Sequence, residues 1–174
     1  MTNKYTITGH TAGLGYCLFN KVNSLGFSRT NGYDITTKGG RQHIIDESTD
    51  CNIFINNAYS GFYQVDMLYE IFDSWKDSNK IIINIGSNTT DGIKSYVHPY
   101  AAHKAALHKA SEQLSNMKTV CKVTNIKFGW LGTERVIEKF NPPKYVSVND
   151  AAEFIISQVE WLKKYRMTES TLMP

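Results

Sequence analysis

Tyr100 and Lys104 are the residues of this sequence whose types and spacing best suit proton transfer. On a helix, side chains four residues apart lie above one another on the same face, so the two functional groups can share a few ångströms of space. A free tyrosine has a pKa of about 10 and a free lysine about 10.4, so neither is a useful acid or base at neutral pH. A neighbouring cation favours the phenolate, so we expect Lys104 to lower the pKa of Tyr100. Such a pair also occurs by chance in many helices, and its meaning depends on the rest of the chain.

A glycine-rich stretch near the N-terminus predicts a phosphate-binding loop. Tyr5–Thr8 is β-branched and aromatic and predicts a short buried strand, and a helix is expected over residues 16–23. Gly9, Gly13 and Gly15 lie between the two elements, where glycine permits a tight turn and lets a phosphate approach the backbone and the helix N-terminus. A surface turn before a helix is the simpler alternative.

The remaining elements are expected to alternate between strands and helices. Further strands are predicted at residues 26–30, 33–36, 52–55, 80–87 and 118–127, and further helices at residues 40–47, 62–76, 97–117 and 148–162. The stretch 80–87 is nearly continuously apolar, as expected for a parallel strand covered on both faces. Ser87 lies at its carboxyl end, where open α/β sheets bind their ligands, although it could also cap a turn or helix.

Five stretches in this order resemble the short-chain dehydrogenase/reductase family. They are Thr8-Gly9-x-x-x-Gly13-Leu14-Gly15, Asn56-Asn57-Ala58, Ser87 placed thirteen residues before Tyr100, Tyr100-x-x-x-Lys104, and Phe128–Thr133, which is similar to the family's P-G-x-x-x-T loop. The resemblance implies one domain over residues 1–174 with a Rossmann-type α/β fold. Its doubly wound sheet would have about six parallel strands in the order 3-2-1-4-5-6, with helices on both faces.

The resemblance also implies an oxidoreductase that transfers a hydride between a nicotinamide cofactor and a carbonyl or alcohol substrate. The expected catalytic residues are Ser87, Tyr100 and Lys104. The residues expected to bind the cofactor are Thr8, Gly9, His10, Thr11, Gly13, Leu14, Gly15, Ser28, Arg29, Thr30, Asp34, Ile35, Asn57, Ala58, Tyr100, Lys104, Gly129 and Thr133. A turn-forming role is the alternative for Asn57.

Arg29 favours NADP(H) over NAD(H) as the cofactor. It follows the predicted second strand, whose end faces the adenosine ribose in a Rossmann fold, and a guanidinium there can bind a 2′-phosphate. A solvated loop arginine is the alternative. Family members that prefer NADP often carry a second basic residue before the middle glycine, and Ala12 stands at that place.

Tyr59 replaces a glycine of the family pattern, which bears on the local backbone shape. Three other departures support an alternative function: no asparagine lies between Phe62 and Lys76 to hold a relay water, the substrate loop at residues 134–146 is short, and no last strand is expected in residues 167–174. The alternative is a catalytically poor module that senses NADP(H) or binds a protein partner. A sugar-nucleotide epimerase is a third reading, which the glycine spacing disfavours.

Composition narrows the class of protein. The 174 residues suit one domain, and 41% of them are hydrophobic. The formal charge of +3 comes from scattered Lys and Arg, which argues against nucleic acid as a partner. No apolar run approaches the ~20 residues of a membrane span. The separated Cys17, Cys51 and Cys121 predict reduced thiols in a cytoplasmic protein, and no metal site is expected. By the resemblance, a homo-oligomer would form through helices 62–76 and 97–117.

Overall fold

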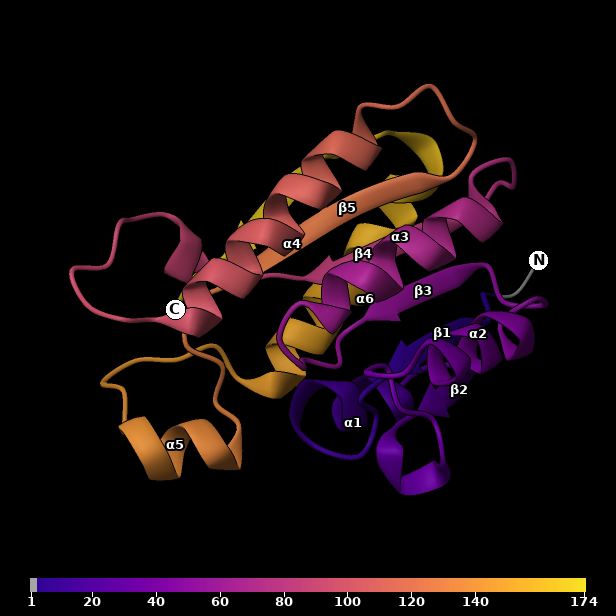
Figure 1. The fold of residues 1–174 in the computed structure, drawn as a ribbon. Coiled ribbons are helices and arrows are strands. Elements are labelled where there is room, and N and C mark those ends of the chain that lie inside the picture. The colour runs from indigo at the N-terminus through magenta and orange to yellow at the C-terminus, as the bar shows by residue number, and fades with distance from the viewer. Residues whose placement is uncertain (1–2) are drawn as a thin grey trace.

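The computed structural model describes residues 3–174 and has a parallel sheet as its centre (Figure 1). Within these residues the sheet has six strands in the order β2-β1-β3-β4-β5-β6, and every neighbouring pair is parallel. The strands are β1 (Tyr5–Thr8), β2 (Ser24–Phe27), β3 (Ile53–Asn56), β4 (Ile81–Ile85), β5 (Lys122–Phe128) and β6 (Glu169–Leu172). The helices are α1 (Gly13–Phe19), α2 (Lys38–Glu47), α3 (Tyr63–Trp75), α4 (Pro99–Ser115), α5 (Glu134–Phe140) and α6 (Val148–Lys164).

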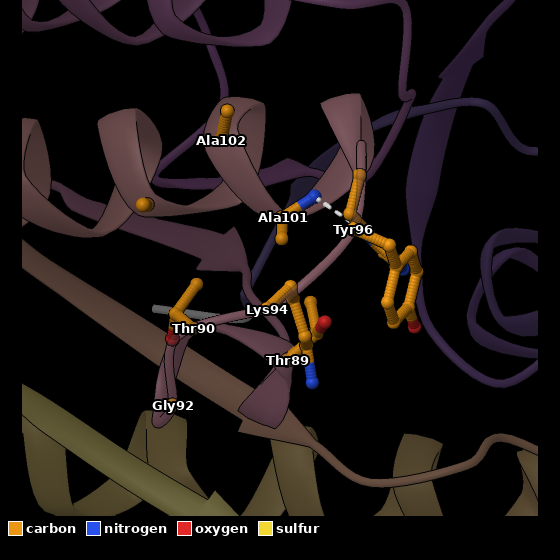
Figure 2. A pocket seen from close by; sticks show the side chains of 9 residues that line it. Thr89, Thr90, Gly92, Lys94, Tyr96, Ala101 and Ala102 are labelled. Carbon is orange, nitrogen blue, oxygen red and sulfur yellow. Dashed lines mark hydrogen bonds between the residues drawn. The ribbon is translucent and has the colours of Figure 1, made fainter.

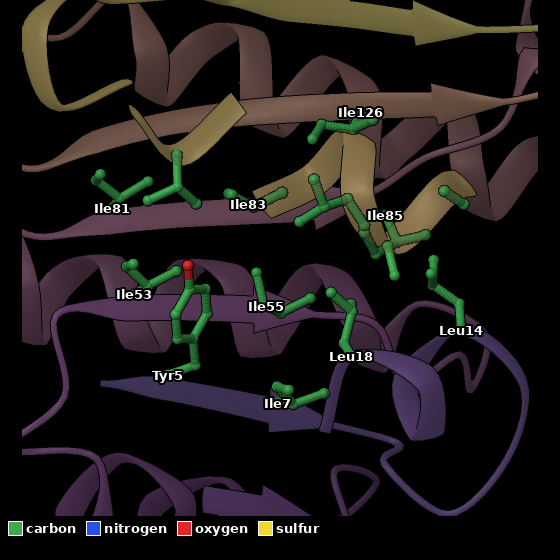
Figure 3. Close-up of a cluster of buried hydrophobic side chains, with 14 of the residues drawn as sticks. Tyr5, Ile7, Leu14, Leu18, Ile53, Ile55, Ile81, Ile83, Ile85 and Ile126 are labelled. Carbon is green, nitrogen blue, oxygen red and sulfur yellow. The ribbon is translucent and has the colours of Figure 1, made fainter. Parts of the chain in front are cut away.

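Helices cover both faces of the sheet, which confirms the predicted fold class. On one face, strand residues such as Ile7, Ile55 and Ile83 pack against Leu14 and Leu18 of α1 and against α6 (Figure 3). On the other face, alternate strand residues pack against α2, α3 and α4. Side chains alternate between the faces of a strand, so a strand such as β4 that is buried throughout must be apolar on both sides.

The predicted strand at residues 33–36 does not form. The Asp34 carboxylate accepts a hydrogen bond from the backbone N–H of Thr36, and Thr37 caps the start of α2 by accepting from the N–H of Gly40. These local bonds make a turn out of a β-branched and aromatic stretch. The sheet therefore ends at β2, followed by the short 3-10 helix η1 (Arg29–Asn31), and not at a third strand beyond it.

A last strand does form, contrary to the expectation that residues 167–174 contain none. β6 pairs with β5 in the register Asn125↔Glu169 to Phe128↔Leu172. Its first residue, Glu169, forms an ion pair with the β5 residue Lys127, whose side chain is 10% exposed. The strand order predicted as 3-2-1-4-5-6 thus loses its outermost strand at one edge and gains one at the other.

The other predicted elements are confirmed, with small shifts of their ends. The glycine loop runs directly into α1, which starts at Gly13 and ends at Phe19, earlier than the helix expected over 16–23. The segment expected as a short substrate loop carries α5, which has no buried residue and is capped by Asn141 in the left-handed conformation, with φ 41°.

Candidate active site

A pocket of about 230 Å³ opens at the carboxyl ends of β1, β2 and β3. It brings together eight of the residues expected to bind the cofactor, Gly9, Thr11, Ser28, Arg29, Thr30, Asp34, Ile35 and Ala58. Four further lining residues were not expected, Phe27, Tyr33, Tyr59 and Ser60. Phe27 and Tyr33 meet edge to face with their ring centroids 4.7 Å apart, so this end of the pocket has an aromatic wall.

The turn after β2 presents hydroxyl groups and a guanidinium at one end of this pocket. Asn31 fixes the turn, since its side chain accepts from the N–H of Ser28 at 2.8 Å and donates to the carbonyl of Gly26 at 2.8 Å. The hydroxyls of Ser28 and Thr30 lie 2.7 Å apart. Arg29, the residue between them in sequence, is exposed and lines the same pocket.

A buried arginine holds the backbone of Ile35, which lines the same pocket. Arg41 of α2 is 7% exposed, donates to the Ile35 carbonyl at 2.8 Å and pairs with Glu70 of α3 at 2.8 Å. The guanidinium thus satisfies the carbonyl of Ile35, in a stretch that pairs with no strand in residues 3–174. The Glu70 bond, set against partial desolvation, raises the pKa of Arg41, so the cation stays charged.

The glycine loop is held against β3 by a set of polar bonds. The Thr8 hydroxyl accepts from the N–H groups of Asn57 and Ala58, both at 3.0 Å. The Asn57 side chain donates to the carbonyls of Thr8 and Gly9 at 3.0 and 3.1 Å. Thr8 and Asn57 therefore shape the loop with their side chains, and the carbonyl ends of β1 and β3 stay in fixed contact.

Two glycines of the loop have positive φ, Gly9 at 71° and Gly13 at 53°, and the third has no room for a side chain. A Cβ on Gly15 would lie 2.1 Å from the Gly9 carbonyl oxygen and 2.6 Å from the Asn57 amide nitrogen. The backbone of α1 and the loop can approach this closely only with glycine at position 15.

We expect Gly15→Ala to lower the free energy of unfolding by about 1–3 kcal/mol or more, because its Cβ collides with backbone that cannot move aside. Gly39→Ala on α2 is the matched control, since nothing lies within 4 Å of the Cβ it adds. That control should be neutral or stabilising by up to about 1 kcal/mol. Urea unfolding of both variants measures the effect, and equal midpoints would contradict it.

Four other expected cofactor residues contact protein rather than the pocket. The His10 ring packs on Phe19, with ring centroids 4.9 Å apart, and covers Gly26. Leu14 is buried in the core under α6. The Gly129 N–H donates to the Leu172 carbonyl at 3.2 Å, beside the C-terminal residues. Thr133 caps α5 through its bond to the N–H of Val136, and its methyl group lies beside Gly13, so α5 starts next to the glycine loop.

Lys104 is almost completely buried at the centre of the expected catalytic group. It is 4% exposed, and its ammonium donates to the Ile85 carbonyl at 2.6 Å and to the Gln64 side-chain oxygen at 2.9 Å. It lies 5.7 Å from the ring centroid of Tyr100. Burial lowers the pKa of Lys104 to about 7, so its charge is only partly present at neutral pH.

Tyr100 and Ser87 also meet at this point. Burial raises the pKa of Tyr100, a hydrogen bond with Ser87 lowers it in part, and the neighbouring Tyr59 raises it further. The expected lowering of this pKa by Lys104 is therefore not found, because Lys104 is itself bonded to Ile85 and Gln64 and partly discharged. The Ser87 hydroxyl also accepts from the N–H of Thr89 at 3.2 Å, so the serine caps the short helix η2 (Asn88–Thr90) as well.

Tyr59 is a site residue whose position no sequence pattern indicated. Its ring meets that of Tyr100 edge to face, with centroids 5.0 Å apart, and lies 5.5 Å from the Lys104 ammonium. Its hydroxyl and the Nδ1 of His103 are 2.8 Å apart. His103 of α4 thus fixes a second phenol, which lines the pocket and also contacts Tyr100.

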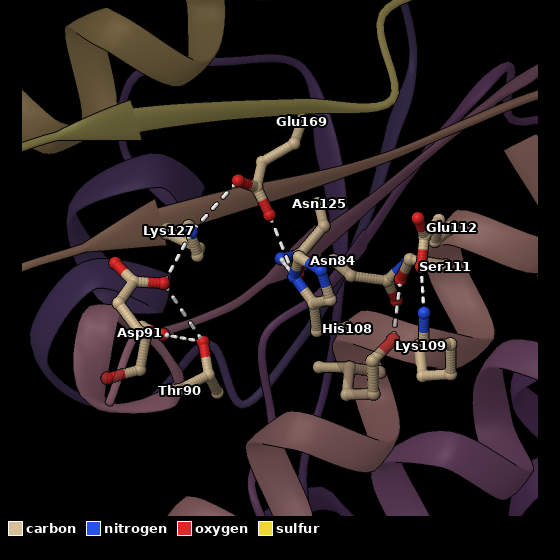
Figure 4. A network of polar contacts seen from close by, with 12 residues as sticks. Asn84, Thr90, Asp91, His108, Lys109, Ser111, Glu112, Asn125, Lys127 and Glu169 are labelled. Atoms are coloured by element: carbon tan, nitrogen blue, oxygen red, sulfur yellow. Dashed lines mark hydrogen bonds and ion pairs between the residues drawn. The ribbon is translucent and has the colours of Figure 1, made fainter. Parts of the chain in front are cut away.

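The segment that follows Ser87 is tied to the edge of the sheet by a polar network (Figure 4). Lys127 bonds Asp91 at 2.6 Å and Glu169 at 2.9 Å, and Glu169 bonds His108 of α4 at 2.7 Å. Thr90 donates to the Ser87 carbonyl at 3.0 Å, which links the network to the serine. Burial alone would lower the pKa of Lys127, but its two carboxylate partners raise it, so this lysine keeps its charge.

A second pocket, of about 270 Å³, lies between η2 and the start of α4 (Figure 2). Thr89, Thr90 and Gly92 form one side, and Ala101 and Ala102 the other. In the described part of the chain, no cluster of metal-ligating side chains and no helix able to cross a membrane is found.

Neither a protein-family model nor a curated protein sequence matches the chain. Solved structures do resemble it. A serine dehydrogenase complexed with NADP+ has a TM-score of 0.81 at 18% identity, covering 98% of this chain and 94% of that one. A short chain dehydrogenase from Burkholderia cenocepacia J2315 in complex with NADP has a TM-score of 0.81 at 18% identity, covering 98% and 87%. A 4-hydroxyisoleucine dehydrogenase complexed with NADH has a TM-score of 0.81 at 15% identity, covering 98% and 97%. At these identities the likeness establishes the fold, which is that of the short-chain dehydrogenases/reductases.

Proposed function

We propose that this chain, which has the fold of the short-chain dehydrogenases/reductases, is a family member that reduces a carbonyl or oxidises an alcohol with NADP(H). The observation that carries the proposal is the meeting of Ser87, Tyr100 and Lys104 at the carboxyl end of β4, beyond the glycine-loop pocket. Open α/β sheets bind their ligands at this edge. When bound, a nicotinamide cofactor supplies or accepts the hydride.

The residues present fit such a cofactor. The glycine loop brings backbone close to the start of α1 with no side chain in between, as a pyrophosphate requires. The pocket of about 230 Å³ is smaller than the roughly 300–1,000 Å³ of a typical ligand site, so it would hold the adenosine end alone. Phe27 and Tyr33 would flank the adenine, while Ser28, Arg29 and Thr30 would bind a 2′-phosphate.

In the reductive direction, Tyr100 would donate its proton to the substrate oxygen. The phenol carries its proton at neutral pH, as a donor must, since its pKa is raised from an ordinary value of about 10. Ser87, which lies near enough to the same hydroxyl to lower its pKa, would orient the substrate oxygen by a hydrogen bond. Lys104 would present its remaining N–H to the ligand, since an ammonium has three donors and the protein uses two.

One observation favours a second function, a poorly catalytic NADP(H)-binding module. Lys104 is partly discharged and the pKa of Tyr100 is raised, so the pair is a weaker acid–base couple than a charged lysine beside a phenolate. NADPH oxidation in the presence of small aldehydes, ketones and quinones separates the two functions. Binding without any oxidation would support the module.

We further propose that copies of the chain pair through α3 and α4.

The cofactor proposal predicts that NADPH stabilises the protein more than NADH. A ligand at 100 times its Kd that binds only the folded state adds about 2.7 kcal/mol, which a thermal unfolding curve detects. Arg29→Ala should weaken NADPH binding about 10–100-fold through the loss of charge-assisted bonds, and leave NADH binding unchanged. Lys164→Ala on α6 removes the same charge far from the pocket and serves as control. A larger NADH shift in the wild type would overturn the preference, and no shift with either would overturn the cofactor.

A further inference from the structure

Gln64 is bonded directly to the expected catalytic group, a contact that the sequence did not indicate. It lies in the first turn of α3, is 1% exposed, and accepts a hydrogen bond from the Lys104 ammonium at 2.9 Å. Buried amides are costly unless their polar atoms are bonded. This amide is therefore placed by the structure, and its oxygen is directed at the one lysine of the catalytic group.

The orientation of the Gln64 amide is determined by Asn56 at the end of β3. The side-chain nitrogen of Gln64 donates to the backbone carbonyl of Asn56 at 2.7 Å. The side-chain nitrogen of Asn56 donates to the backbone carbonyl of Gln64 at 2.9 Å. If the Gln64 side-chain amide were turned over, its NH2 group would face the Lys104 ammonium and its oxygen would face the backbone carbonyl oxygen of Asn56. The oxygen of Gln64 must therefore face Lys104.

The bonds continue from Asn56 into the helix that carries Lys104. The Asn56 side chain donates to Asn84 of β4 at 2.8 Å, and Asn84 donates to the hydroxyl of Ser111 of α4 at 2.9 Å. Ser111 in turn donates to the Leu107 carbonyl at 2.8 Å. β3, β4, α3 and α4 thus share one buried network, and the distance between Gln64 and Lys104 is set from both sides.

Few groups around Lys104 stabilise its charged form, and Gln64 is one of them. Desolvation is the cause of the lowered pKa of Lys104, and in residues 3–174 this lysine takes part in no ion pair. The titratable groups that face it are the phenols of Tyr59 and Tyr100, with His103 bonded to Tyr59. The oxygens of Gln64 and Ile85 are therefore the acceptors that stabilise its charged form.

We propose that Gln64 is a positioning residue that acts through Lys104, holding the ammonium against the Ile85 carbonyl and keeping it charged for its contact with the ligand. The inference rests on the proposed oxidoreductase function. It assigns a direct side-chain bond where the resemblance led us to look for an asparagine and a relay water.

The test replaces Gln64 by Met and by Glu in the full chain, with Gln113→Met as matched control. Gln113 of α4 also contacts α3, but it is exposed, and its oxygen accepts from the Tyr69 hydroxyl at 3.1 Å. The first readout is the pKa of Lys104, which is measured by NMR on protein with lysine labelled with ¹³C at Cε. The Lys104 signal is the one that is absent from Lys104→Met. This readout needs no turnover.

Gln64→Met should lower the pKa of Lys104 by about one to two pH units, because a bond to the charged form is lost. Gln64→Glu should raise it by about one to three units, because a carboxylate then faces the ammonium. Gln113→Met should leave it unchanged. If Gln64→Met does not fold, Gln64→Glu carries the test, and an unmoved pKa in that variant overturns the proposal.

The second readout is the pH dependence of kcat/KM for NADPH oxidation, which reports the free enzyme. Its alkaline limb should move with the pKa of Lys104, downward in Gln64→Met and upward in Gln64→Glu. If the pKa moves while the limb stays in place, Gln64 has no positioning role in the reaction, although the oxidoreductase function stands. If the wild type itself oxidises no NADPH with any carbonyl, the proposed function has failed, and the role of Gln64 in the reaction fails with it.

Discussion

Tyr100→Phe is expected to bind NADPH with unchanged affinity and to lose turnover by a factor of about 10²–10⁴, the usual contribution of a general acid. The variant removes one hydroxyl and keeps the ring, which packs edge to face on Tyr59 with centroids 5.0 Å apart. The shape of the site is therefore retained. What the variant loses is the Tyr100 hydroxyl, which lies beside Ser87 and is the proposed proton donor to the substrate oxygen.

Steady-state oxidation of NADPH with the best carbonyl substrate measures the loss, and a thermal shift with NADPH checks that binding is intact. Tyr165→Phe is the matched control, because it removes the same hydroxyl from an exposed residue just beyond α6. It should keep full turnover. Undiminished turnover in Tyr100→Phe would remove this tyrosine from the mechanism, while equal losses in both variants would point to a general effect on folding.

The second large effect is a dependence of stability on pH that comes from Lys104. Its pKa is about 7 in the folded protein, below the ordinary value of 10.5. Between these values the unfolded chain binds the proton and the folded protein does not, so a rise in pH favours the folded state. Its contribution to stability grows as the pH rises above about 7 and is lost as the pH falls through that value.

We therefore expect the unfolding free energy of the wild type, relative to Lys104→Met, to rise with pH by up to about 1.4 kcal/mol per unit between pH 7 and 9. Urea unfolding of both proteins at half-unit intervals gives the difference curve. Lys118→Met, which removes an exposed lysine, is the control and should give a constant offset. If the difference between the wild type and Lys104→Met does not change with pH, the buried amine keeps its ordinary pKa. If the difference falls as the pH rises, the sign of the argument is wrong.

The order of elements could be predicted because it rests on local signals. The apolar run of β4 and the glycine loop each indicate their structure within a few residues. Tyr33–Thr36 misled the prediction, since the capping of Asp34 and Thr37 outweighs the β-propensity of this stretch. β6 could not be predicted, because the polar Glu169 stabilises its strand through Lys127 and His108, which lie far away in sequence.

The same distinction applies to the candidate site. Ser87, Tyr100 and Lys104 lie near one another, as their spacing led us to expect, and their catalytic role stays a prediction. The pocket also collects the residues of the second-strand turn. Gln64 and Tyr59 could not be predicted, because their roles depend on contacts with α4, which lies some forty residues further along the chain. The lowered pKa of Lys104 was missed for a similar reason, since burial is a property of the packed molecule.

The strand order also bears on how the chain can be assembled during synthesis. β2 and β3 lie on the two sides of β1, and each later strand pairs with the one before it, so every new strand joins a free edge and none must be inserted between paired strands. The sheet can therefore grow in step with translation, from the N-terminus outward. Ser87, Tyr100 and Lys104 leave the ribosome before β5 exists, and the bond between Lys104 and Gln64 can form on a sheet whose far edge is still open. The pairing of Glu169 with Lys127 then becomes the closing step, made when the last strand emerges.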